Sequence, residues 1–164
     1  QCHIDIAKAV WLDYCDCHML DTIAREPLWR HLINYRCGTG HSVSFVGNVH
    51  EGPHALNGRN TTLMRPGMIV TDEPGVYETD LVGIRIENEL VCVHKADNQY
   101  GTFLGFEPIM FVPIATSPIV PGVLTKDELD WLNNYHRQVF EKLAPRLNDE
   151  EREWLAKKCA AIGC

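Results

Sequence analysis

Residues 83–87 read Gly83-Ile84-Arg85-Ile86-Glu87, an alternation of apolar and charged side chains that is typical of a β-strand. The alternation places both isoleucines on one face of the strand and both charged residues on the other. Charge in the middle of a strand is costly where that face is covered by apolar groups, and useful where it lines a site. The stretch therefore predicts a strand that carries a candidate functional surface.

Short β-rich runs separated by glycine and proline surround this strand between about residues 36 and 114. We predict further strands at 68–70, 90–94 and 109–113. The region has few segments that could serve as crossover helices between parallel strands, so we expect a largely antiparallel sheet. These features predict an α+β fold.

Helical periodicity dominates residues 1–35. Apolar residues within 4–11 recur at spacings of three and four, which predicts one amphipathic helix. A second helix is predicted to begin near His18 and to end or kink at Pro27, because proline lacks the backbone N–H that continues a helix.

The region 115–164 is also predicted to be helical. Thr125-Lys-Asp-Glu128 has the pattern of a capping box at the start of one helix, Pro145 interrupts it, and Asn148 caps another. A chain of 164 residues is long enough for one domain and short for two, so we expect a single partial domain over 1–164. Burial is expected for the apolar stripe of the first of these helices, namely Leu129, Leu132, Val139 and Phe140.

Composition narrows the range of partners. The 22 acidic and 15 basic residues give a net charge of −7, which argues against nucleic acid or an anionic membrane as the main partner. No apolar run approaches the roughly 18 residues of a membrane span. The seven cysteines form no even framework, which favours reduced thiols and a cytoplasmic protein. Because the first residue is Gln1, we expect either removal of an upstream segment or a piece of a longer chain.

Five residues of the central region could carry chemistry: His41, His50, Glu73, Arg85 and Glu87. Their residue types alone suggest a carboxylate and imidazole site for a hard divalent metal ion. Spacing alone also allows a structural interpretation, in which the histidines lie in turns or the core and the charged residues are solvated. Neither interpretation is decided by spacing.

The local sequences around these residues resemble the second half of the catalytic domain of aminopeptidase P (Xaa-Pro aminopeptidase). This family is a branch of the pita-bread metallopeptidases, which include prolidase and methionine aminopeptidase. The resemblance covers nearly the whole chain and implies the C-terminal half of a pita-bread fold, with a curved, largely antiparallel sheet and helices on its convex face. Four motifs carry it in this order: Cys37-Gly-Thr-Gly-His41, Asn48-Val-His50-Glu-Gly-Pro53, Gly67-Met-Ile-Val-Thr-Asp-Glu73-Pro-Gly75 and Gly83-Ile-Arg-Ile-Glu87-Asn88.

The resemblance implies a role for each of the five residues. His41, Glu73 and Glu87 match metal ligands, and Glu73 also matches the group that handles the proton of the attacking water. His50 matches a histidine that contacts the substrate near the scissile carbonyl, and Arg85 matches an arginine that orients the neighbouring acids. The implied cofactor is a pair of divalent ions, with manganese first and zinc or cobalt as alternatives. We expect the three ligands to converge on one ion.

The sequence also departs from the family pattern. Two aspartate ligands expected before this region are absent, so we expect a missing N-terminal half of the domain. Cys37 stands where a substrate-binding histidine is usual, and Ser42 and Ser44 replace glycines beside the ligand histidine.

The function implied by the resemblance is release of the N-terminal residue that precedes proline, by metal-activated hydroxide. The implied partner is a peptide with proline in second position, and apolar surface left by the missing half would favour a homodimer. The alternatives are a prolidase-type dipeptidase and a catalytically dead pita-bread module that binds a protein or peptide. We expect the isolated chain to be incomplete and poorly active.

Overall fold

The computed structural model describes residues 1–163 and divides into two compact units. The first unit is Gln1–Met110 and the second is Phe111–Cys164. Within the described residues, every strand belongs to the first unit, and the second unit is helical. The expected α+β class with antiparallel strand pairing is confirmed.

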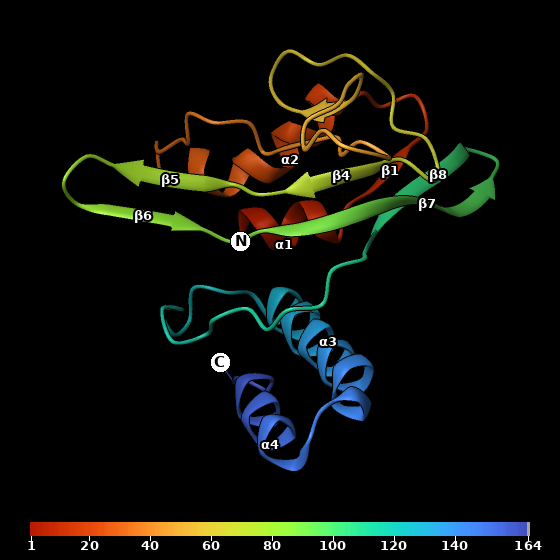
Figure 1. The fold of residues 1–164 in the computed structure, drawn as a ribbon. Coiled ribbons are helices and arrows are strands. Elements are labelled where there is room, and N and C mark those ends of the chain that lie inside the picture. Colours follow the sequence, from red (N-terminus) through yellow and green to blue (C-terminus); the bar gives the residue numbers. More distant parts are fainter. Residues whose placement is uncertain (164) are drawn as a thin grey trace. The chain divides into compact units, whose positions relative to one another are not determined.

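A four-stranded sheet forms the centre of the first unit, and all its neighbouring strands are antiparallel. Two small two-stranded sheets accompany it, β2 with β3 and β5 with β6. Figure 1 shows β5 and β6 as a hairpin that extends beyond the end of β4 and β7. The order in the large sheet is β1 (Val10–Leu12), β8 (Gly101–Pro108), β7 (Asn88–Asn98) and β4 (Ile69–Asp72), and the small sheets are β2 (Gly40–His41), β3 (Ala55–Leu56), β5 (Gly75–Glu78) and β6 (Val82–Arg85).

The register of the strands connects the large sheet to the β5–β6 hairpin. Asp72 pairs with Asn88 in the large sheet, and Gly75 pairs with Arg85 in the hairpin. Two residues on each strand lie between these pairs, so the register continues through the interruption without a bulge. Counting inward from both pairs sets Glu73 opposite Glu87, although neither residue belongs to a strand.

Two helices pack in the first unit, α1 (Cys2–Ala7) and α2 (Cys17–Trp29). Helix α1 contacts α2, β4 and β8, and its Ile6 side chain is completely buried. The side chain of Trp11 on β1 packs on Phe106 of β8, with ring centroids 4.6 Å apart. This apolar core supports the strands that carry the candidate site.

The N-terminal helix prediction was wrong in part. The predicted helix over 4–11 ends at Ala7, and Val10–Leu12 forms an edge strand on β8 instead. Pairing with β8 satisfies the backbone groups of residues that also favour strands, and this outweighs the helical spacing. Pro27 lies within α2, which ends two residues later at Trp29, so the proline removes one helix hydrogen bond without ending the helix at its own position.

The strand predictions held only in part. Strands at 68–70, 83–86 and 90–94 correspond to β4, β6 and β7, with shifted ends. No strand forms at 109–113, and the partner of β7 is β8, at 101–108. The short turn between β7 and β8 makes this pairing local, whereas 109–113 already leaves the sheet.

As far as residue 163, the helices of the second unit are α3 (Lys126–Leu143), a short 3-10 helix (Ala144–Arg146) and α4 (Asp149–Lys158), and they follow an irregular segment at 111–125. Both predicted caps are confirmed, because Thr125 with Glu128 and Asn148 with Glu151 form capping boxes. The predicted stripe is buried except for Phe140, which is only partly buried.

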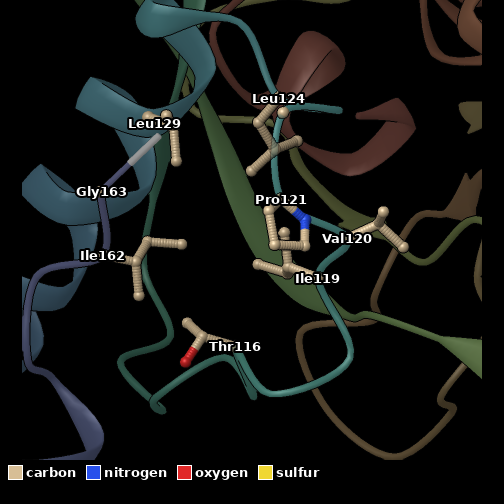
Figure 2. A pocket seen from close by; sticks show the side chains of 9 residues that line it. Thr116, Ile119, Val120, Pro121, Leu124, Leu129, Ile162 and Gly163 are labelled. Atoms are coloured by element: carbon tan, nitrogen blue, oxygen red, sulfur yellow. The ribbon is translucent and has the colours of Figure 1, made fainter.

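The second unit also contains an apolar hollow of about 230 Å³. Figure 2 shows Ile119, Leu124, Leu129 and Ile162 around it. Among residues 1–163, no charged or titratable side chain lines this hollow. Among the helices of residues 1–163, none has the length and apolarity that crossing a membrane requires.

Candidate functional site

The candidate site lies where β2 meets β4. Gly40 allows a close approach of these strands, because a Cβ atom at this position would lie 1.7 Å from the Thr71 carbonyl oxygen. The backbone N–H of His41 donates to the hydroxyl of Thr71 over 2.9 Å, and the backbone N–H of Glu73 donates to the Thr39 carbonyl over 2.7 Å. These contacts bring His41 and Glu73 together from segments 32 residues apart.

His41 is held in an orientation that leaves one ring nitrogen facing Glu73. Its Nδ1 lies 3.0 Å from the Ser42 carbonyl oxygen, which can only accept, so Nδ1 carries a proton. Its Nε2 lies 3.0 Å from Glu73 Oε1. In a neutral ring, Nε2 presents a lone pair to a carboxylate oxygen, and only a cation relieves that repulsion. The two atoms therefore converge on a place for a proton or a metal ion.

Arg85 occupies the other side of the Glu73 carboxylate. Its Nη1 donates to Glu73 Oε2, while its Nη2 lies 3.9 Å from the sulfur of Cys37. The Cys37 thiol also donates to the Gly75 carbonyl over 3.5 Å. Cys37, which departs from the family pattern, therefore lies in the same site as Arg85 and Glu73.

His50 completes the set of rings. It stacks on His41 with ring centroids 3.7 Å apart and an interplanar angle of 19°. Both histidines line a cavity of about 430 Å³, together with Cys37, Glu73 and Arg85. The structure thus brings four of the five predicted site residues around one polar cavity.

Glu87 is placed differently. Its side chain is exposed and does not line this cavity, although the strand register sets it opposite Glu73. Arg85 lies two residues before Glu87 on the same strand face, and it is Arg85 that contacts Glu73. The alternation predicted for this stretch is supported, because Ile84 and Ile86 line a separate hollow on the other face.

A buried network that the sequence did not predict holds the loop before His41. Asp21 accepts from Arg25 Nε over 2.7 Å and from the Thr39 hydroxyl over 2.5 Å. The Tyr35 hydroxyl in turn contacts that of Thr39, and burial keeps the pKa of Tyr35 far above its usual range. Arg25 also donates over 2.8 Å to each of the carbonyls of Tyr35 and Cys37. An arginine and an aspartate four residues apart on a helix were the only signal of this network in the sequence.

The opposite face of β4 carries a second buried pair. His3 Nδ1 on α1 lies 3.0 Å from Asp72 Oδ2, and both side chains are almost fully buried. Burial raises the pKa of the Asp72 carboxyl, and the neighbouring His3 opposes that shift. Because side chains alternate along a strand, Asp72 faces α1 while Glu73 faces the cavity.

The two serines that replace family glycines are accommodated near His41. Ser42 is buried, and its hydroxyl donates to the Glu51 carbonyl, which joins the two ends of the loop between His41 and His50. The hydroxyl oxygen of Ser44 is buried without a hydrogen-bond partner. Ser42 therefore adds a hydrogen bond, whereas the buried, unpaired hydroxyl of Ser44 lowers local stability.

The donor set fits part of a metal site. A metal-ligating histidine typically donates its second ring N–H to a carbonyl, as His41 does, and an adjoining carboxylate suits a hard divalent ion. Residues 1–163 nevertheless contain no group of three or more His, Cys, Asp or Glu side chains arranged to hold a metal ion. Of the three predicted ligands, His41 and Glu73 lie together in this structure, Arg85 takes the second oxygen of Glu73, and Glu87 is exposed outside the cavity.

The chain matches two families along its length. Residues 1–94 match "Metallopeptidase family M24", and residues 102–162 match "C-terminal region of peptidase_M24". The first match covers more than half of the chain, so the chain belongs to metallopeptidase family M24.

The most similar relatives within this family include aminopeptidases P. The chain is 42% identical to aminopeptidase P1 of Lotus japonicus, covering 98% of this chain and 25% of the relative. It is 44% identical to aminopeptidase P2 of Arabidopsis thaliana, covering 94% of this chain and 23% of the relative. The chain thus spans about a quarter of the length of these curated relatives.

Solved structures agree with this placement. The X-prolyl aminopeptidase of Caenorhabditis elegans, described as a cytosolic enzyme with a di-nuclear active site, matches with a TM-score of 0.89 at 37% identity. That match covers 98% of this chain and 27% of the other. The prolidase of Pyrococcus furiosus matches less closely, with a TM-score of 0.53 at 25% identity over 65% of this chain and 28% of the other. The chain therefore has the expected pita-bread architecture.

Proposed function

We propose that this chain forms one wall of the active site of an Xaa-Pro aminopeptidase, which releases the N-terminal residue preceding proline. The observation that carries the proposal is the convergence of His41 Nε2 and Glu73 Oε1 in a polar cavity beside Arg85 and His50. The similarity to an X-prolyl aminopeptidase over nearly the whole chain supports it.

In this proposal His41, Glu73 and Glu87 would hold divalent ions, together with residues outside this chain. The bound ions, manganese first and zinc or cobalt as alternatives, would supply Lewis acidity to the peptide carbonyl and to water. The Glu73 carboxylate receives the proton of the attacking water through Oε1, because Arg85 holds Oε2. Arg85 thereby orients Glu73.

His50 serves the substrate in this proposal. Its ring is fixed by stacking on His41 and faces the cavity, so a ring N–H can donate to the carbonyl oxygen of the scissile bond. A donor placed there stabilises the charge that develops on this oxygen in the transition state. The peptide partner carries proline in second position, and we place the enzyme in the cytoplasm, as described for the Caenorhabditis elegans enzyme.

A chimera tests the proposed function. This chain replaces the matching segment of the Caenorhabditis elegans enzyme, and hydrolysis of an Xaa-Pro tripeptide and an Xaa-Pro dipeptide is followed by chromatography with added manganese. We expect the tripeptide to lose its first residue. Glu73→Gln should lower kcat by about 10²–10⁴-fold, whereas Glu107→Gln, on an exposed part of β8, should leave it unchanged.

The same assay separates the alternatives. Cleavage confined to the dipeptide would indicate a prolidase-type dipeptidase. A folded chimera that binds the tripeptide without cleaving it would indicate a catalytically dead binding module. Either result would replace the proposal.

A further inference from the structure

We propose that Thr71 is a positioning residue that sets the orientation of the Glu73 carboxylate toward His41. The proposal rests on the proposed function for the roles of His41 and Glu73. Thr71 is the third residue of β4 and lies two residues before Glu73, which directly follows this strand, and only 3% of the Thr71 surface is exposed.

The hydroxyl of Thr71 has both its partners fixed by the structure. The backbone N–H of His41 donates to Oγ1 over 2.9 Å, so the hydroxyl is an acceptor on that side. Its own proton is donated to Glu73 Oε1 over 2.9 Å. A carboxylate can only accept, so the direction of this chain of hydrogen bonds is settled from the His41 backbone to the Glu73 side chain.

The Thr71 hydroxyl therefore connects the backbone N–H of His41 to the Glu73 carboxylate, which the His41 ring also faces. The Glu73 Oε1 atom lies 2.9 Å from Thr71 Oγ1 and 3.0 Å from His41 Nε2. Together with Arg85 on Oε2, this leaves the carboxylate little freedom to rotate. Without the hydroxyl, the His41 N–H loses its acceptor and Glu73 Oε1 loses the donor that holds it.

Nuclear magnetic resonance of the 164-residue chain tests the proposal without requiring activity. Thr71→Val replaces the hydroxyl by a methyl group of similar size, and Thr71→Ser keeps the hydroxyl. We expect amide hydrogen exchange of His41 to accelerate about tenfold in Thr71→Val, the equivalent of one hydrogen bond. The ring signals of His41 and the carboxyl ¹³C signal of Glu73 should shift in the same variant.

Thr71→Ser should restore the parent exchange rate and signals. The matched control is Thr22→Val, whose hydroxyl bonds only within its own helix, and it should change none of these readouts. Amides in the β7–β8 ladder, such as Leu104, should keep their protection in every variant. If Thr71→Val does not fold, Thr71→Ala removes the hydroxyl without adding bulk and gives the same readouts.

Three results would overturn the proposal. His41 exchange and ring signals could stay at the parent values in Thr71→Val, or Thr71→Ser could fail to restore them. The β7–β8 amides could also lose protection equally, which would show a general loss of stability. An inactive chimera would count against the proposed function alone, because the Thr71 readouts do not depend on turnover.

Discussion

A single methyl group added at Gly40 would separate the two strands that form the site. The Cβ atom of Gly40→Ala would lie 1.7 Å from the Thr71 carbonyl oxygen. Carbon and oxygen atoms in contact lie about 3.3 Å apart, so β2 must withdraw by about 1.6 Å. The atoms it meets belong to the backbone of β4, which cannot move aside as a flexible side chain can.

This withdrawal would break the hydrogen bonds between the strands. The bond from His41 N–H to Thr71 is 2.9 Å long and that from Glu73 N–H to the Thr39 carbonyl is 2.7 Å, so neither survives a shift of this size. Two lost hydrogen bonds cost about 1 kcal/mol each, and the overpacking adds about 1–3 kcal/mol. We expect the free energy of unfolding of the first unit to fall by about 3–5 kcal/mol.

Urea unfolding followed through the amide signals of β7 and β8 measures this loss within the first unit. The matched control is Gly38→Ala, where the nearest atom to the added Cβ is the Leu56 carbonyl oxygen at 3.4 Å. That variant should stay within about 1 kcal/mol of the parent. A loss below about 1 kcal/mol for Gly40→Ala, with His41 exchange unchanged, would refute the close approach of β2 and β4.

Three further predictions concern the core, the thiols and metal binding. Leu132→Ala on α3 should lower the free energy of unfolding of the second unit by about 2–5 kcal/mol, as measured by urea unfolding. The exposed control Val123→Ala should lower it by under about 0.5 kcal/mol. A loss below about 1 kcal/mol for Leu132→Ala would contradict the burial of this side chain. Burial raises the pKa of the Cys17 and Cys92 thiols from 9.0 to about 11, so the unfolded chain releases these protons first and stability should be lost as pH rises from 9 to 11. The loss should be about 2–3 kcal/mol per thiol, and an equal loss in Cys92→Ala would exclude that thiol as a cause. Manganese added to the 164-residue chain should bind weakly and broaden the nuclear magnetic resonance signals of His41 and Glu73. It should support no turnover of an Xaa-Pro tripeptide. Calorimetry that shows two tightly bound ions would contradict the incomplete donor set.

Local rules in the sequence predicted the elements whose causes are local. The capping boxes at Thr125 and Asn148 begin helices where expected, because the cap and its partner lie three residues apart. The alternation in 83–87 likewise gave the correct faces of β6. The strand at Val10–Leu12 was not predicted, because its pairing with β8 joins residues about ninety positions apart and local spacing carries no information on such a contact.

The candidate site, too, was predicted where the signal is local and missed where it depends on long-range contacts. The motifs identified His41, His50, Glu73 and Arg85, which do share one cavity. They could not show that Arg85 takes an oxygen of Glu73 while Glu87 stays exposed, since that outcome depends on side-chain reach across a ribbon. The network around Asp21 was missed for the same reason, because its partners are assembled only when α2 packs beside the loop at 34–39.

The facing positions of Glu73 and Glu87 limit how the gene segment between them can change in length. The two strands alternate with a period of two, so one residue inserted within β5 or β6 would turn every later side chain to the opposite face and move Glu87 away from Glu73. An insertion at the turn of 79–81 leaves both ladders in place, because that turn contributes no paired residue. Length variation among relatives should therefore collect at the tip of this hairpin and be absent from its strands.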